Sequence, residues 1–388
     1  MKNQKAKIKF GIMASSTLQM AAMGLMPLVP LVIAHYYNES ITAVQTAFTL
    51  PMLTTVPAML TVGFLSKYIG KKIPLLIGLA VIMIFGITPA LFDLSFPVFM
   101  IMLGGFGVGI GSIMSSSAGM ITDYFEGAER ADLMGKQSAY VNLGGMLLAA
   151  AVGVLLAFGW KTAFFVYLYA IPLILIVMVF IPSDKKSHSE KAAEANIKMK
   201  LSSETLFICV IFFIYGVFQG VTMPNVGLLV LERNLGEPAT ASLAVSILTA
   251  VGIITGMLYG RIALVLKKYA LPFGFTVMAL GQIVSASATV APQLYAGFII
   301  LGVGFSIVMP TGVFRSSQSV DQASSTLAMS VFFATLGTAL FFSPMITNPL
   351  SAAIASGTAQ NRYFISATVL LMLTVVTLVY VLREKKAP

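Results

Sequence analysis

Two long apolar segments carry amide, thioether and aromatic side chains at helical spacing. The sets are Gln19, Met23 and Met26 in the first segment and Tyr215, Gln219 and Met223 in the second. Such spacing places the side chains of each set on one face of a helix. Amides and hydroxyls bind neutral polar groups by hydrogen bonds, and thioethers and rings offer adaptable apolar surface. We therefore expect these faces to bind a small neutral or largely apolar organic solute.

Residues of the same chemistry occur in neighbouring segments and extend the candidate binding surface. They are Gln45, Thr49, Tyr140, Asn142, Asn225, Phe305 and Met309. Each also has a structural alternative, because Met and Phe commonly pack in membrane helices and buried amides form interhelical hydrogen bonds of about 0.6 kcal/mol. The sequence leaves both roles open.

Ionisable side chains are absent from the middle of the apolar segments. Each Lys, Arg, Asp and Glu can be placed in a loop or within about one turn of a helix end. The two histidines, His35 and His188, lie at a segment end and in the central loop. A charge at the bilayer midplane costs at least about 2.5 kcal/mol and therefore normally marks a function. Without buried arginines to hold an anion, the sequence favours a neutral solute and leaves the energy coupling open.

The sequence lacks the motifs of a membrane-embedded enzyme or an ATP-driven pump. It contains no His-Glu-x-x-His pattern, no buried histidine for a serine protease and no Gly-x-x-x-x-Gly-Lys-Ser/Thr loop. The single cysteine, Cys209, excludes an intramolecular disulfide. We therefore expect no enzyme activity, no metal ion and no cofactor.

Twelve apolar segments position these residues, and each is long enough to cross a membrane. Only 10% of the residues are charged, against roughly 25% in soluble domains, and a spanning helix needs about 20 apolar residues. The segments are 10–34, 41–66, 73–92, 97–121, 137–158, 162–181, 205–231, 241–266, 271–290, 294–314, 326–346 and 363–382. The predicted fold class is an all-α integral membrane protein with twelve transmembrane helices.

The distribution of basic residues supports this count. If both termini lie in the cytoplasm, 21 of the 24 basic residues fall in inner segments, and only Lys161, Arg233 and Arg362 fall outside. The positive-inside rule predicts this asymmetry, which indicates a multi-pass protein of the inner (plasma) membrane. The net charge of +10 is spread over short loops near anionic lipid. We therefore expect the lipid bilayer, and no nucleic acid, as a partner.

The two halves of the chain share a pattern at a shift of 197 residues. Met26-Pro27 recurs as Met223-Pro224, and the ungapped shift carries Gly63 onto Gly260, Gly105 onto Gly302 and Gly107 onto Gly304. Such a duplication is typical of secondary transporters, whose halves rock about a site between them. We predict two pseudo-symmetric six-helix bundles, at 1–181 and 204–388, joined by a polar cytoplasmic linker at 182–203.

Motifs at the ends of several segments carry a family resemblance. They are Gly63-Phe64-Leu65-Ser66-Lys67-Tyr68-Ile69-Gly70-Lys71-Lys72, Gly105-Phe106-Gly107-Val108-Gly109, Asp123-Tyr124-Phe125 with Arg130 and Gly135, and Gly159-Trp160-Lys161-Thr162-Ala163-Phe164. In this order and at these spacings, the whole chain resembles the major facilitator superfamily. The resemblance implies a secondary transporter that works by alternating access, closest in pattern to bacterial exporters of drugs and metabolites. We expect it to be a monomer.

The resemblance also implies a cytoplasmic gate after the second segment. Its residues in this chain would be Gly63, Lys67, Gly70, Lys71, Asp123, Arg130 and Asp321. Lys67 stands where the family signature has an acidic residue, and a lysine near a helix N-terminus is disfavoured by about 0.3–1 kcal/mol. We therefore expect Lys67 to point to lipid phosphate or to pair with Asp321 or Asp123. The outward-facing state would then be held less strongly than in relatives.

The direction of transport has two interpretations. The overall pattern favours export, but the fifth segment lacks the Gly-Pro pair that is typical of drug–proton antiporters. The alternative is an uptake permease for a small, weakly polar solute, similar to the cyanate and nitroimidazole permeases. A channel or a solute-sensing membrane receptor is an alternative of another class, because a duplicated helical bundle does not by itself prove turnover.

Overall fold

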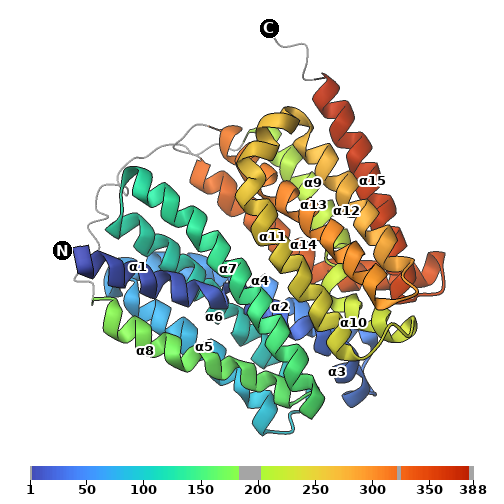
Figure 1. Cartoon of the computed structure of the whole chain (residues 1–388), viewed down its shortest axis with the longest axis horizontal. Helices are drawn as coiled ribbons and strands as arrows, with labels where there is room; N and C mark the ends of the chain where they lie inside the picture. The colour runs from blue at the N-terminus through green and yellow to red at the C-terminus, as the bar shows by residue number, and fades with distance from the viewer. Residues whose placement is uncertain (1, 183–201, 321–324, 384–388) are drawn as a thin grey trace. The chain divides into compact units, whose positions relative to one another are not determined.

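The computed structural model describes residues 2–182, 202–320 and 325–383 (Figure 1). The described residues form helices joined by short turns, and none of them lies in a strand. The helices of the first half are α1 (Lys2–Ser16), α2 (Ala21–Leu25), α3 (Val29–His35), α4 (Ile41–Ile69), α5 (Lys72–Leu91), α6 (Phe96–Tyr124), α7 (Gly127–Leu155) and α8 (Ala170–Phe180). Short 3-10 helices, η1 (Thr17–Met20), η2 (Met26–Leu28), η3 (Leu156–Phe158) and η4 (Thr162–Tyr169), connect several of them.

The second half repeats this organisation with long helices and one short 3-10 turn. Its helices are α9 (Ser203–Gln219), α10 (Thr222–Glu232), α11 (Pro238–Leu266), α12 (Ala270–Ala286), α13 (Ala291–Gln318), α14 (Ser325–Ile354) and α15 (Ala359–Arg383), with η6 (Lys267–Tyr269) between α11 and α12. The all-helical fold predicted from the sequence is confirmed.

Eleven apolar segments of the described chain are long enough to cross a membrane, and one of them is long enough to cross it twice. The segment Pro238–Ala286 has 49 residues, which at 1.5 Å per residue would form a straight helix of about 74 Å, more than twice the hydrocarbon core. It contains both α11 and α12, and Lys267 between them has a positive φ of 49°, so the chain turns there. The eleven segments therefore correspond to the twelve crossings predicted.

The first crossing of each half is interrupted near its matched proline. In the first half, η1 and η2 divide the crossing into α1, α2 and α3, and Pro27 lies within η2. In the second half, α9 ends at Gln219 and α10 begins at Thr222, two residues before Pro224. Proline has no N–H group to donate, so it removes one hydrogen bond of a continuous helix and favours the first turn of a new one.

The chain forms two compact units. They follow the two halves of the sequence, except that two short segments of the first half belong to unit 2. Unit 1 contains Met1–Leu25, Leu31–Glu39 and Ala47–Asn196. Unit 2 contains Met26–Pro30, Ser40–Thr46 and Ile197–Pro388. The first crossing and the first turns of α4 therefore contribute residues to both units.

Glycines in unit 1 bring α4, α5 and α6 into close contact. A Cβ added to Gly107 would lie 2.3 Å from the carbonyl oxygen of Pro51 on α4. A Cβ added to Gly109 would lie 2.7 Å from Ile82 and 2.9 Å from the carbonyl oxygen of Gly78 on α5. These backbones approach too closely for any side chain, as is common between membrane helices.

The same packing recurs in unit 2 with a different register from the one the sequence predicts. A Cβ on Gly302 would lie 2.8 Å from the carbonyl oxygen of Leu248 on α11, and a Cβ on Gly304 would lie 3.0 Å from that of Gly274 on α12. By their packing, Gly107 corresponds to Gly302 and Gly109 corresponds to Gly304. The ungapped pairing of Gly105 with Gly302 and of Gly107 with Gly304 is therefore wrong by two residues.

The helix bounds explain this correction. Helix α4 begins at Ile41 and α11 at Pro238, which keeps the shift of 197 residues, whereas α6 begins at Phe96 and α13 at Ala291, which is a shift of 195. Between the end of α4 and the start of α6 the chain has two more residues than between the end of α11 and the start of α13, and α12, with 17 residues, is shorter than α5, with 20. The repeat is therefore gapped, and the difference in length lies between the packed positions, at helix ends as well as in connections.

Candidate functional site

A polar cluster in unit 1 joins η1 to α6 and α7. The side-chain amide of Gln19 donates from Nε2 to Oγ of Ser117 at 2.8 Å. Gln137 donates from Nε2 to Oγ of Ser117 at 2.9 Å and to Oγ of Ser16 at 3.1 Å. The two glutamines are half-buried, while the two serines are buried. No charged side chain of the described residues bonds to this cluster.

Close backbone contact between α7 and η1 positions this cluster. A Cβ added to Gly144 would lie 1.9 Å from the carbonyl oxygen of Thr17. The hydroxyl of Tyr167 donates to the carbonyl oxygen of Ala21 at 2.8 Å, and Oγ1 of Thr17 lies 3.3 Å from the hydroxyl of Tyr169. The irregular backbone of the first crossing is therefore satisfied by protein groups, as a membrane interior requires.

Other residues predicted for the binding surface lie elsewhere in unit 1. Met23 is half-buried and Tyr140 is 37% exposed, so both can offer apolar surface beside the cluster's helices. Thr49 is buried. Asn142 donates from Nδ2 to the carbonyl oxygen of Ser138 at 2.9 Å, one turn earlier in its own helix. The binding role of each remains a prediction.

Four polar side chains form a buried network in unit 2. Gln45 donates from Nε2 to Oδ1 of Asn225 at 2.9 Å and accepts from Nδ2 of Asn348 at 2.7 Å. Oδ1 of Asn225 also accepts a bond from Nη1 of Arg362 at 2.6 Å. All four side chains are less than 9% exposed. Gln45 and Asn225 thus contact protein groups in this structure, and their predicted role in binding stays a prediction.

Arg362 is a buried charge that the sequence analysis placed in an outer connection. It lies in the first turn of α15, where Nη2 donates to the carbonyl oxygen of Gly357 at 2.7 Å. The carboxylate of Glu232 accepts from the backbone N–H of Ala359 at 2.8 Å and so caps the same helix. A buried cation requires such compensation. Only its three-dimensional partners reveal this role, because its sequence position is typical of a solvated helix end.

An aromatic cluster of unit 2 joins α9 to α12 and α14 and includes Tyr215, a predicted binding residue. The ring of Phe212 packs against Phe332 with centroids 4.7 Å apart, and Tyr215 packs against Phe275 at 5.5 Å. The Tyr215 hydroxyl and the Oε1 atom of Gln219 are buried without a partner among the described residues. Met223, Phe305 and Met309 are half-buried, and Met26 is buried.

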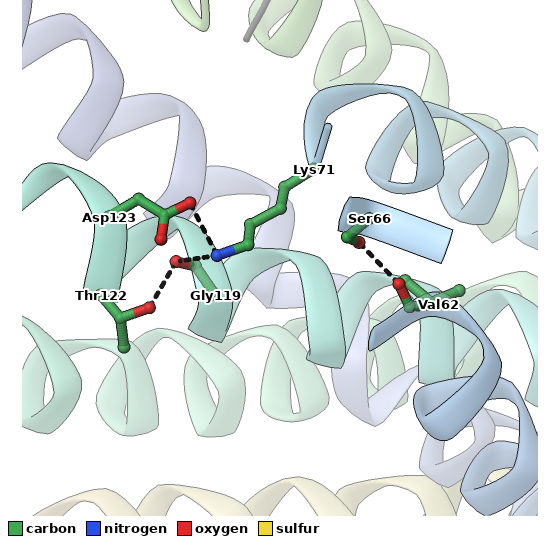
Figure 2. A network of polar contacts seen from close by, with 6 residues as sticks. All are labelled: Val62, Ser66, Lys71, Gly119, Thr122 and Asp123. Carbon is green, nitrogen blue, oxygen red and sulfur yellow. Dashed lines mark hydrogen bonds and ion pairs between the residues drawn. The ribbon is translucent and has the colours of Figure 1, made fainter. Parts of the chain in front are cut away.

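Lys71 forms the ionic contact at the end of α6 (Figure 2). Its Nζ lies 2.6 Å from Oδ2 of Asp123 and donates to the carbonyl oxygen of Gly119 at 2.9 Å. Gly70 has a positive φ of 74°, which glycine adopts without strain, so the chain can turn into α5 at this point. The structure thus brings together three of the predicted gate residues.

The other predicted gate residues are not joined to this pair. Gly63 and Arg130 are exposed. Asp321 and the side chain of Lys67 lie outside the described residues, so the predicted Lys67 contacts remain an expectation. The partner of Asp123 among the described residues is Lys71.

A second ion pair joins two connections of unit 1. Lys161 donates a hydrogen bond to Oδ1 of Asp93, and this bond holds the pKa of the Asp93 carboxyl below its ordinary value of 3.8. Burial, together with the Asp93 charge, raises the pKa of the Tyr36 phenol above 10.0, and its hydroxyl donates to the carbonyl oxygen of Leu94 at 2.9 Å. These groups lie far in sequence from the polar cluster.

A metal centre has no support in the part of the chain that the structure describes. No three His, Cys, Asp or Glu side chains of these residues gather into a group that could hold an ion. The single cysteine, Cys209, is buried and is not in a disulfide.

The apolar crossings, the interrupted first helices and the repeated packing pattern are those of a multi-pass helical membrane protein. The family model of the Major Facilitator Superfamily matches residues 11–220 and 208–388, and the chain belongs to this family. It is therefore a transporter of the secondary type. No curated protein sequence matches the chain significantly.

Solved transporters share the fold at low sequence identity. The peptide transporter POT in complex with sulfate has a TM-score of 0.76 at 13% identity, covering 97% of this chain and 94% of its own. The POT family transporter PepTSo has a TM-score of 0.75 at 12% identity, covering 99% of both chains. A bacterial homolog of the human lysosomal transporter Spinster, in an inward-facing and unoccupied conformation, has a TM-score of 0.73 at 14% identity, covering 98% of this chain and 96% of its own. At these identities the likeness concerns the fold alone.

Proposed function

We propose that this transporter moves a small neutral or largely apolar organic solute across the cytoplasmic membrane by alternating access, in the direction of export. The observation that carries the proposal is the chemistry of the cluster formed by Ser16, Gln19, Ser117 and Gln137. Its polar groups are amides and hydroxyls, which bind uncharged groups, and no ionised side chain of the described residues bonds to them. An anionic solute would need a cation at the site.

Two cations of the described chain, Arg362 and Lys71, are already engaged with protein groups. Arg362 is bonded to Asn225 and to the backbone of Gly357, and Lys71 is paired with Asp123. A solute carboxylate or phosphate would have to replace these contacts at a cost, because a buried charge that loses its partner is strongly unfavourable. This argument supports a neutral solute.

Export rests on the overall pattern shared with drug and metabolite exporters, and uptake is the second candidate. We propose a monomer in the inner membrane with both termini in the cytoplasm, since 21 of the 24 basic residues then fall on the inner side. The halves 1–181 and 204–388, linked by 182–203, would be the bodies that move.

A growth screen tests both the solute class and the direction. Cells that lack or overproduce the protein are exposed to matched toxic compounds that are neutral, anionic or cationic. We expect deletion to raise sensitivity to neutral compounds and overproduction to lower it. If deletion instead raises resistance, the protein takes solutes up, and effects confined to charged compounds contradict a neutral solute.

Counterflow in proteoliposomes distinguishes a carrier from a channel or a receptor. The purified protein is reconstituted with an unlabelled neutral compound from the screen inside, and the labelled compound is added outside. A carrier accumulates label transiently above equilibrium, because it exchanges one solute for another. A channel only equilibrates the label, and a receptor moves none.

A further inference from the structure

The protons of two serine hydroxyls in unit 1 are already committed to the backbone. Oγ of Ser117 donates to the carbonyl oxygen of Ile113 at 2.6 Å, and Oγ of Ser16 donates to that of Ile12 at 2.8 Å. A serine hydroxyl has one proton and two acceptor sites. Toward any other neighbour, therefore, both serines act only as acceptors.

This commitment fixes the orientation of the two neighbouring amides. Gln137 places its NH₂ group between Ser16 and Ser117, at 3.1 and 2.9 Å, and Gln19 places its NH₂ group 2.8 Å from Ser117. If either amide were turned by 180°, its oxygen would face a serine oxygen, and no proton would lie between these two acceptors. The hydrogen-bond network itself thus assigns nitrogen and oxygen in both side chains.

The amide oxygens of Gln19 and Gln137 consequently point away from the serines. Neither oxygen accepts a hydrogen bond from any residue that the structure describes. Both side chains are half-buried, and neither amide oxygen is among the buried atoms that lack a partner, so both oxygens remain accessible. In a membrane-spanning helix such polar surface faces protein or a water-filled cavity rather than lipid.

We infer that Gln19 and Gln137 present a pair of hydrogen-bond acceptors to the transported solute, and that Ser16 and Ser117 are positioning residues that hold both amides in this orientation. The inference rests on the proposed function and narrows its solute class. The preferred solute is neutral and carries N–H or O–H donors. A solute that offers only acceptors displaces water from the amide oxygens without replacing its hydrogen bonds, which weakens binding.

Matched pairs of neutral probes test this inference on the purified full-length protein. Benzamide and phenol carry donors, and N,N-dimethylbenzamide and anisole are their methylated counterparts without them. The shift of the thermal unfolding midpoint with probe concentration gives an apparent Kd for each. We expect the donor member of each pair to bind about three- to tenfold more tightly, which is the worth of one neutral hydrogen bond. The methylated members are more apolar, so hydrophobicity alone predicts the opposite order.

Variants separate positioning from stability. In the double variant Ser16→Ala/Ser117→Ala the two amides can rotate and offer either N–H or oxygen to the probe. The ratio of the two apparent Kd values in each pair should therefore fall toward one, while both members still bind. Ser117→Thr keeps the hydroxyl and should keep the preference. Ser116→Ala is the matched control, because Ser116 is a buried neighbour on α6 without a partner among the described residues, and it should bind like the parent protein.

Each outcome decides between the two proposals. Equal binding of both members of each pair, or a preference that persists in Ser16→Ala/Ser117→Ala, overturns the acceptor pair but leaves transport of a neutral solute standing. Stabilisation by benzoate or benzylammonium and by none of the neutral probes overturns the proposed solute class itself. A donor preference that the double variant removes supports both.

Discussion

At the scale of single residues, Lys71 combines two favourable contacts at the C-terminal end of α6. It pairs with the carboxylate of Asp123 and donates to the carbonyl oxygen of Gly119. The last carbonyls of a helix carry partial negative charge, so a cation is favoured there beyond the ion pair itself. The side chains of Lys71 and Asp123 are 16% and 33% exposed, which protects the pair from part of the solvent screening.

We expect Lys71→Asp to lower thermal stability more than Lys71→Ala, because it sets two carboxylates beside helix-end carbonyls. Adding Asp123→Lys should recover only part of the loss, since the aspartate at position 71 still faces the Gly119 carbonyl oxygen. The exposed pair Lys136–Asp132 is the control, and its exchange should cost less than about 0.5 kcal/mol. Thermal unfolding of the purified variants measures this. Full recovery by the exchange would show that the helix end contributes nothing.

Part of the site's chemistry could be predicted from residue types, and its partners could not. Gln19 stands out as an amide in an apolar helix, and it does take part in a polar cluster. Gln137 was missed as a site residue because it opens its apolar segment and so reads as a helix end. Its partners, Ser16 and Ser117, are 121 and 20 residues away. The contact between Gln45 and Asn225 could not be predicted for the same reason, because these residues are 180 positions apart in the sequence.

At the scale of elements, the distance between helices depends on particular glycines, and the sequence alone does not show which glycines lie in a close helix contact. Gly135 and Gly144 lie on the same helix, α7, yet a Cβ at Gly144 would meet the Thr17 carbonyl oxygen at 1.9 Å, and one at Gly135 would meet nothing within 4 Å. Helix existence follows from apolar length, so it was predictable. Which glycine faces another backbone depends on rotation and tilt, which apolar composition leaves undetermined.

We expect Gly144→Ala to destabilise the protein by about 1–3 kcal/mol, because a backbone carbonyl cannot move aside as a side chain can. Gly135→Ala should be neutral or stabilising by up to about 1 kcal/mol, since alanine favours a helix over glycine. Thermal unfolding of the two purified variants provides the comparison. Equal stability of the two would mean that α7 and η1 are not in contact.

At the scale of the whole molecule, basic residues and helix count predict one arrangement in the membrane. The turn at Lys267 and Lys268 lies between α11 and α12 and belongs to the inner side in this prediction. The connections that precede α11 and follow α12 belong to the outer side. A segment of 49 residues that crossed only once would place these two connections on opposite sides.

Single cysteines distinguish the two arrangements, because Cys209 is the chain's one cysteine and can be replaced by serine. In that background we expect Glu237→Cys and Thr289→Cys to react with a membrane-impermeant maleimide added to intact cells. Lys268→Cys should react only after the membrane is permeabilised. Reaction of Glu237→Cys and Thr289→Cys from opposite sides would contradict the twelve crossings.

The gapped correspondence between the halves records where this chain has tolerated changes in length since its duplication. Removing one residue from a helix interior rotates everything beyond it by about 100°, which would turn Gly302 away from Leu248 and Gly304 away from Gly274. Removing one residue from a connection leaves these contacts intact. Compared with Pro51, Gly78 and Gly107 of the first half, one residue is missing between Leu248 and Gly274 and one more between Gly274 and Gly302. Helices α4 and α11 both have 29 residues, whereas α12 is three residues shorter than α5. Evolutionary changes in length have thus fallen between the packed positions, at helix ends as well as in connections, and the packed positions have kept an ancestral register.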